Sequence, residues 1–183
     1  MFLKYYKQKL IAEKRLFGRE NFVFFWNTDG SAESCLSQWF PCAFVVEDVC
    51  YNSTEQYMMA QKAAVFGDTE IFAEIMASYN PGEIKKLGRR VRNFDSDVWS
   101  EKSREVVLTG NLAKFTQNGK LRDYLLSTGD RILVEVSPFD VIWGIGYGAE
   151  AAEAMRPDLW RGENHLGFIL MQVRDRLRAD AGK

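Results

Sequence analysis

Start and stop signals for three short helices follow one another within residues 53–90. Ser53 begins a capping box, in which a glutamine follows three positions later, and Gly67 is the kind of residue that ends a helix. Asp68 can cap a second helix, and a third can begin at Pro81, which follows an asparagine. These signals predict three separately terminated helices in this part of the chain.

Further helices and strands are predicted on both sides of this region. Apolar residues at helical spacing predict helices from about Ser96 to Phe115, from Leu121 to Leu126 and from Asn164 to about Arg178. Runs of β-branched and aromatic residues predict strands at 22–26 and 132–136, and a hairpin from 43–46 and 49–51. We therefore predict an α+β fold, with helices packed around a small antiparallel sheet. A chain of 183 residues is short for two domains, so we expect one, from 21 to 183.

Residues 1–20 differ from the rest of the chain in charge. They hold six Lys or Arg and two Glu, about +4, so the remainder carries about −5 of the net charge of −1. Aromatic residues interleave with the basic ones, a composition that can contact phosphates and stack on bases. We therefore treat this segment as a basic aromatic N-terminal arm. The alternative is an amphipathic helix that lies on the domain.

Several classes of protein are excluded by composition. No apolar run approaches the roughly 18 residues of a membrane span, and the N-terminal residues lack a secretory signal, so we expect a cytoplasmic protein. Three cysteines without a close pair and a single histidine argue against a disulfide framework and a zinc site. We expect no metal and no cofactor. His165 stands at a predicted helix start, where a surface or capping role is expected, so carboxylates and lysine must carry any chemistry.

Glu55 and Lys62 are the first candidates for that chemistry. They stand seven positions apart in one predicted helix, and at about 100° per residue both side chains leave the same face, roughly two turns apart. Opposite charges that leave one face of a helix rich in Met and Ala suggest a pocket. The alternative is a buried salt bridge.

A second group of candidates follows the predicted strand at 132–136. Glu135 lies at the strand end, Asp140 follows a proline turn, and glycines at 144, 146 and 148 can let backbone amides approach a ligand. The glycines lack the strand–turn–helix context of a dinucleotide fingerprint. Arg89 and its neighbouring arginines could contact a phosphate, or could form a solvated helix end. Asp140 could equally serve only to hold a turn.

Several blocks of sequence, in a fixed order, make the chain similar to a known family. The blocks are Leu36-Ser37-Gln38-Trp39-Phe40-Pro41, Thr54-Glu55-Gln56-Tyr57, Ala60-Gln61-Lys62, Leu87-Gly88-Arg89, Trp99, Asn111-Leu112-Ala113-Lys114-Phe115, Leu133-Val134-Glu135, Asp140, Trp143-Gly144-x-Gly146 and Gly162-x-Asn164-x-Leu166-Gly167. From about Phe24 to Leu177 the chain resembles the NADAR or YbiA-like superfamily. It departs at Gln56, where the family often has His, at Gln38-Trp39, where Asn-Phe is frequent, and at His165, where an apolar residue is usual.

The resemblance implies hydrolysis of an N-glycosidic bond to ribose. The active-site set that it carries over is Glu55, Lys62, Trp99, Glu135, Asp140 and Trp143. We expect Glu55, Lys62, Glu135 and Asp140 to be catalytic, and the expected substrate contacts are Ser37, Trp39, Arg89, Trp99, Trp143, Gly144, Gly146 and Asn164. Cleavage of an N-riboside develops oxocarbenium character that a carboxylate stabilises, and a desolvated lysine can trap an opened sugar as a Schiff base. Lys62 is therefore either a covalent catalyst or the electrostatic partner of Glu55.

Members of the family are associated with two substrate classes. One is ADP-ribose attached to guanine by toxin-type ADP-ribosyltransferases, and the other is the phosphoribosyl intermediates of riboflavin synthesis. The expected function is removal of ADP-ribose from guanine in DNA, RNA or nucleotides, a repair or antitoxin role with a cognate toxin as possible partner. Hydrolysis of the riboflavin intermediates and ADP-ribose binding without cleavage are the alternatives.

Overall fold

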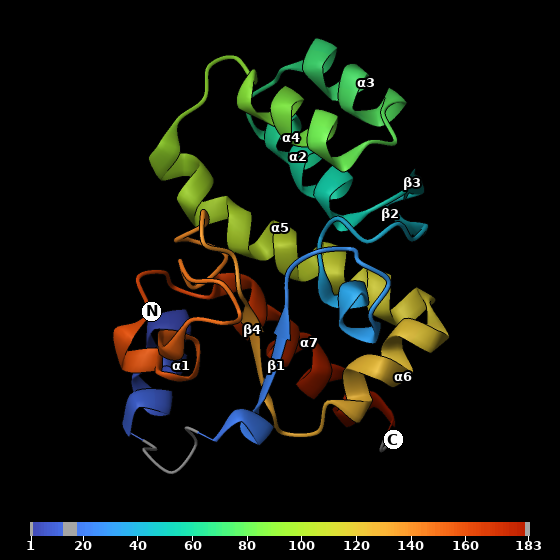
Figure 1. Cartoon of the computed structure of the whole chain (residues 1–183). Helices are drawn as coiled ribbons and strands as arrows, with labels where there is room; N and C mark the ends of the chain where they lie inside the picture. The colour runs from blue at the N-terminus through green and yellow to red at the C-terminus, as the bar shows by residue number, and fades with distance from the viewer. Residues whose placement is uncertain (1, 13–17, 182–183) are drawn as a thin grey trace. The chain divides into compact units, whose positions relative to one another are not determined.

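The computed structural model describes residues 2–12 and 18–181 of the chain and divides into two compact units (Figure 1). Unit 1 combines Met1–Ser37 with Asp123–Lys183, and unit 2 is Gln38–Arg122. Helices and short strands both occur, which confirms the α+β class. No helix in the described part of the chain is both long and apolar enough to span a bilayer.

Unit 2 begins with the predicted antiparallel hairpin. Strand β2 (Phe44–Val46) pairs with β3 (Val49–Tyr51). The two residues between them, Glu47 and Asp48, have φ values of 50° and 62°, the left-handed conformation that a two-residue hairpin turn requires. Phe44 and Tyr51 are buried, and their rings stack with centroids 5.9 Å apart. The hairpin prediction is confirmed.

The helices of unit 2 begin at the predicted caps. They are α2 (Thr54–Val65), α3 (Thr69–Ala77), α4 (Pro81–Arg89) and α5 (Ser96–Gln117). Ser53 Oγ accepts a hydrogen bond from the Gln56 N–H (3.2 Å), and Asp68 Oδ1 accepts one from the Ile71 N–H (3.3 Å). Helix α2 packs against the other three, which makes it the central element of the unit.

In unit 1 the two strands are parallel. Strand β1 (Phe22–Phe25) pairs with β4 (Ile132–Glu135) in a register that places Phe25 beside Glu135. The prediction of an antiparallel sheet is therefore wrong for this pair. Parallel strands need a long connection between them, which a local sequence pattern does not indicate. Here that connection includes all of unit 2.

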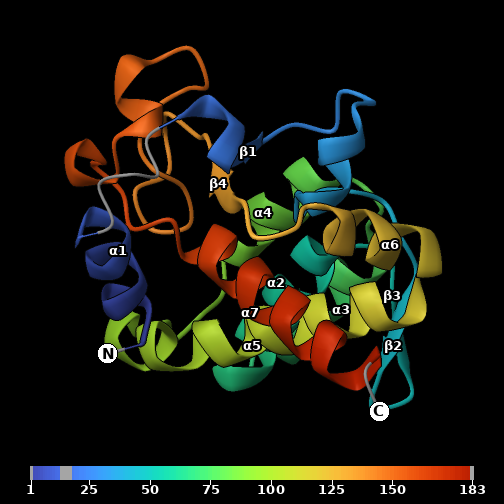
Figure 2. The same ribbon diagram turned by 90° about the horizontal axis from the view of Figure 1, so that it is seen from below.

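Helices cover the remainder of unit 1. Helix α6 (Gly119–Ser127) leads to β4, and α7 (His165–Ala181) packs on β4 so closely that a β-carbon at Gly167 would collide with the Leu133 carbonyl oxygen. Helix α1 (Phe2–Ala12) contacts the short helix η5 (Pro157–Leu159) and α7 (Figure 2). The remaining short helices are η2 (Arg19–Asn21), η3 (Ala32–Leu36) and η4 (Ala152–Met155). Lys14, Arg15 and Phe17 of the predicted arm lie outside the described residues.

Candidate active site

Glu55 and Lys62 lie on α2, as predicted. Glu55 is buried, with 4% of its surface exposed, in the first turn of the helix, where the helix dipole favours a carboxylate. Lys62 is half-buried, and its Nζ donates to the Gly88 carbonyl oxygen at 2.7 Å. The ammonium also lies 4.0 Å from the ring centroid of Phe94. Within the described residues no ion pair joins Lys62 to Glu55, so the direct salt bridge is not what the structure shows.

The surroundings of Lys62 lower its pKa below the ordinary value for lysine. Burial is the larger cause, because it disfavours the charged ammonium, and the positive charge of Arg89 acts in the same direction. Arg89 is the last residue of α4, the helix that also supplies the Gly88 carbonyl. A lysine in this setting has a larger share of neutral, nucleophilic amine than a solvated lysine has.

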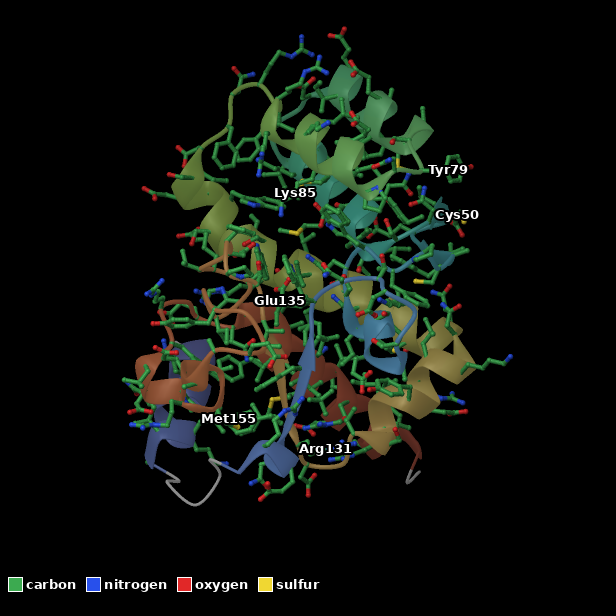
Figure 3. All side chains as sticks on the ribbon, in the orientation of Figure 1. Cys50, Tyr79, Lys85, Arg131, Glu135 and Met155 are labelled. Carbon is green, nitrogen blue, oxygen red and sulfur yellow. The ribbon has the colours of Figure 1, made fainter. Side chains whose placement is uncertain are left out.

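Two tryptophans predicted to contact a ligand also belong to unit 2. Trp99 is half-buried in the first turn of α5, and Trp39 is 39% exposed. Lys85 is labelled in Figure 3. Its ammonium lies 5.9 Å from the Trp39 ring centroid. Lys85 is not among the predicted site residues, although it stands four residues before Arg89 and so lies on the same face of α4. Phe94 is not among them either, because no periodic or motif signal in the sequence indicates it.

Gln56, which stands where the family often has His, joins the start of α2 to the end of α3 through side-chain hydrogen bonds. Its side chain is buried, and Nε2 donates to the carbonyl oxygens of Ile75 (3.2 Å) and Ser78 (3.0 Å), at the end of α3. Its Oε1 accepts from the Asn52 N–H at 2.8 Å. These bonds fix the start of α2, and with it the position of Glu55.

In unit 1, Glu135 ends β4 with its backbone held on both sides. Its N–H donates to Asn164 Oδ1 at 3.0 Å, and its carbonyl oxygen accepts from the Ile145 N–H at 3.0 Å. Asn164 Nδ2 donates to the Leu133 carbonyl oxygen at 2.9 Å, so the amide bridges two residues of the strand. Asn164 is fully buried, and its hydrogen bonds hold the backbone of this end of β4 in place.

Asp140 forms a tight turn in front of Trp143. Its Oδ1 accepts from the N–H groups of Ile142 (2.9 Å) and Trp143 (2.8 Å), so this oxygen serves the turn. A β-carbon at Gly144 would lie 2.9 Å from the Glu135 carbonyl oxygen, so only glycine lets the loop approach the strand end so closely. The glycine at 146 has a φ of 73°, a conformation that L side chains rarely adopt.

The remaining predicted residues of unit 1 are buried. His165 is 9% exposed at the start of α7, and its ring meets Trp143 edge to face with centroids 5.9 Å apart. Of the expected surface or capping role, the surface part is therefore wrong, because the imidazole is buried against Trp143. Ser37 is buried directly after η3.

The predicted site residues thus fall into two groups, one in each unit. Unit 1 contains Ser37, Glu135, Asp140, Trp143, Gly144, Gly146 and Asn164, and unit 2 contains Trp39, Glu55, Lys62, Arg89 and Trp99. Within unit 1 hydrogen bonds and close packing bring Glu135, Asp140 and Trp143 together around the Gly144 loop. Among the described residues no group of three or more His, Cys, Asp or Glu could hold a metal ion.

Known proteins share both the sequence and the fold of this chain. The model of the NADAR domain matches residues 24–178. The N-glycosidase R617 of Acanthamoeba polyphaga mimivirus is 43% identical over 163 residues, 85% of this chain and 96% of that protein. The riboflavin biosynthesis protein VVA0006 of Vibrio vulnificus is 30% identical over 159 residues, 87% of this chain but 39% of its own length.

A solved structure agrees with these relatives. The NMR structure of the E. coli protein YbiA has a TM-score of 0.74 and 26% sequence identity, covering 91% of this chain and 90% of that one. The family match extends across both units, from β1 to α7, so it includes every residue of the candidate site. The chain belongs to the NADAR domain family.

Proposed function

We propose that this protein is an N-glycosidase that removes ADP-ribose from guanine bases and so reverses the action of an ADP-ribosyltransferase toxin. The reaction class is supported by the name of the mimivirus relative, an N-glycosidase that aligns over 96% of its length. The observation that carries the chemistry is Lys62, whose pKa is lowered on the same helix as the buried Glu55. Such a pair supplies a nucleophilic amine and a carboxylate from one rigid element.

The proposed reaction uses these groups as follows. As the bond from ribose C1 to the base breaks, oxocarbenium character develops at C1, and Glu55, on the same helix as Lys62, stabilises it. Asp140 is less suited to this role, because its Oδ1 already accepts two hydrogen bonds from backbone N–H groups of its own turn. The electron pair of the broken bond leaves with the guanine, which takes up a proton, and the neutral Lys62 amine adds to C1. Opening of the ribose ring, whose oxygen takes up the proton lost by the amine, then gives an imine. Water then hydrolyses the imine, releasing the sugar and restoring the amine.

A second candidate is hydrolysis of phosphoribosyl intermediates of riboflavin synthesis. The observation in its favour is the Vibrio vulnificus relative, whose name assigns it to riboflavin biosynthesis. This chain covers 39% of that protein. The same carboxylates and amine would serve, because the bond broken is again an N-glycosidic bond to ribose.

Product analysis tests the proposed function. The protein should release guanosine and ADP-ribose from ADP-ribosylated guanosine faster than it cleaves a riboflavin intermediate, with both products measured by chromatography. Glu55→Gln should lower the rate about 10²–10⁴-fold, the scale of a lost acid–base group. Glu101→Gln, an exposed glutamate of α5, should leave it unchanged. Binding of ADP-ribose with no product would instead indicate a binding module.

Borohydride reduction tests the covalent step. Reduction during turnover should fix the ADP-ribose moiety on Lys62, and the mass of the peptide containing Lys62 should rise accordingly. If no adduct forms at Lys62 and Lys62→Arg retains activity, the lysine acts only through its charge.

A further inference from the structure

The ring of Phe94 lies directly beside the amine of Lys62. Lys62 Nζ is 4.0 Å from the ring centroid, the distance of a cation that rests on the face of an aromatic ring. Phe94 belongs to the loop that joins α4 to α5, and 46% of its surface is exposed. Because the ring is still partly open to solvent, a sugar that reaches the amine can also contact the ring.

The loop that carries Phe94 is held by a carboxylate on each side. On one side, Asp68 Oδ2 accepts from the backbone N–H (2.9 Å) and from Nε (3.1 Å) of Arg92. On the other side, Asp95 Oδ1 accepts from two N–H groups in the first turn of α5, at 2.8 and 3.0 Å. The ring itself meets Phe66 edge to face, with centroids 5.3 Å apart. These contacts fix the position of the ring before a substrate binds.

The face of the Phe94 ring is a site for positive charge. The π electrons make the face negative, which attracts the ammonium form of Lys62. The proposed reaction uses the neutral amine, which has lost this attraction. The ring therefore has no cation on its face at the stage when positive charge develops on the sugar.

The sugar carbon that reacts with Lys62 comes within range of the same ring. Nζ has to approach C1 to about 3–3.5 Å before a bond can form. Since Nζ lies 4.0 Å from the centroid, an approach from the side puts C1 about 5 Å from it, within the roughly 6 Å range of cation–π attraction. A fixed ring at this distance suits a short-lived positive charge, because it need not move when the charge forms.

We propose that Phe94 is a further catalytic residue, whose ring face stabilises the positive charge that develops on C1 as the N-glycosidic bond breaks. The inference rests on the proposed function, because C1 becomes positive only when the base departs with the electron pair of that bond. The sugar of the bound substrate carries no such charge, so the ring favours the transition state over the substrate. Loss of the interaction should slow bond cleavage about 2- to 30-fold.

Fluorination of the ring tests the proposal with little change in shape. Fluorine atoms withdraw π density from the face, so phenylalanine carrying one, two and three of them at position 94 should lower the rate of bond cleavage in steps. The rate is that of guanosine release from ADP-ribosyl-guanosine in a single turnover at saturating substrate. It is measured at the pH plateau, where a changed Lys62 pKa contributes nothing. The substrate concentration that gives half the maximal rate should stay the same, and Phe94→Leu should be as slow as the trifluorinated protein.

The same analogues at Phe66 are the matched control. This ring packs on Phe94, and within the described residues no cation lies over its face, so fluorination there should leave the rate unchanged. Two results overturn the proposal: equal rates throughout the series at position 94, or an equal fall in the series at position 66, which would show an effect of packing.

The outcomes also separate this proposal from the proposed function. If the unsubstituted protein releases no guanosine, the proposed function itself is refuted. If it releases guanosine at a rate that fluorination of Phe94 does not change, only the catalytic role of Phe94 is refuted.

Discussion

Lys62 shows how one residue acquires reactivity from groups distant in sequence. Its amine donates to the Gly88 carbonyl oxygen, lies over Phe94 and feels the charge of Arg89. None of these groups is near it in the chain. Spacing within α2 predicted the direction of the side chain, which depends only on helix geometry. It could not predict the lowered pKa, because that depends on how α4 packs against α2.

The pH dependence of catalysis should report this lowered pKa. If the neutral amine reacts, kcat should rise with pH, and the midpoint of the rise should lie below 10.5, the ordinary pKa of lysine. Arg89→Gln removes a positive charge, which raises the Lys62 pKa, so the rising limb should move to higher pH. Arg90→Gln, the neighbouring exposed arginine, should leave the limb in place. An unchanged limb in Arg89→Gln would contradict the electrostatic argument.

At the scale of elements, local signals were sufficient for helices and insufficient for strand pairing. The caps at Ser53, Asp68 and Asn80 each bond within three residues, so their sequence patterns specify them directly. The parallel pairing of β1 with β4 joins segments that are distant in the chain. The periodicity of apolar residues predicts a strand but does not indicate which other strand it pairs with. The hydrogen bonds of Asn164 to Leu133 and Glu135 of β4 likewise join distant segments, so no local pattern predicts them.

Helix α1 is tied to the loop that supports the candidate site of unit 1. Lys7 Nζ donates to the carbonyl oxygens of Gly162 (3.0 Å) and Trp160 (3.4 Å), and it lies 3.8 Å from Glu163 Oε1. The Gly162 N–H in turn donates to the Ile145 carbonyl oxygen at 2.9 Å, within the glycine loop. Helix α1 thus agrees with the alternative prediction for the N-terminal segment, a helix that lies on the domain.

Lys7→Met should therefore destabilise the protein. Loss of charged hydrogen bonds to two carbonyls costs about 1–2 kcal/mol, and for a chain of this size that lowers Tm by about 2–8 °C in a thermal melt. Lys9→Met is the matched control, because Lys9 is exposed on the same helix and should change Tm little. Equal melting of the two variants would show that the Lys7 contacts contribute nothing.

Charge at the scale of the whole molecule affects the choice between a nucleic acid and a free nucleotide. The net charge is −1, and the N-terminal segment is one of two strongly basic stretches of the sequence, the other being residues 85–92. Lys7 and Arg19 of the N-terminal segment donate hydrogen bonds to backbone carbonyl oxygens of unit 1. Within this segment, a role in nucleic-acid binding is therefore left to the other four basic residues, which are Lys4, Lys9, Lys14 and Arg15.

Replacement of those four residues by glutamine should weaken activity on ADP-ribosylated DNA at low salt. For each phosphate that the variant no longer neutralises, the slope of log affinity against log salt should fall by about 0.7–0.9. Activity on ADP-ribosyl-guanosine, which has no polymer backbone, should stay the same. The measurement is a salt series with both substrates. Identical salt dependence in the variant would show that the segment does not bind DNA.

The parallel pairing of β1 with β4 also sets the order in which the chain can fold. During synthesis β1 is made first, and its partner follows only after residues 26–131, which include all of unit 2. The hairpin and helices of unit 2 depend on contacts near in sequence, so they can form before β4 exists. Until then Phe22-Val23-Phe24-Phe25 is an apolar strand with both edges open, the kind of segment that drives aggregation. A nascent chain stalled before Ile132 would therefore be far more prone to aggregate than the finished protein.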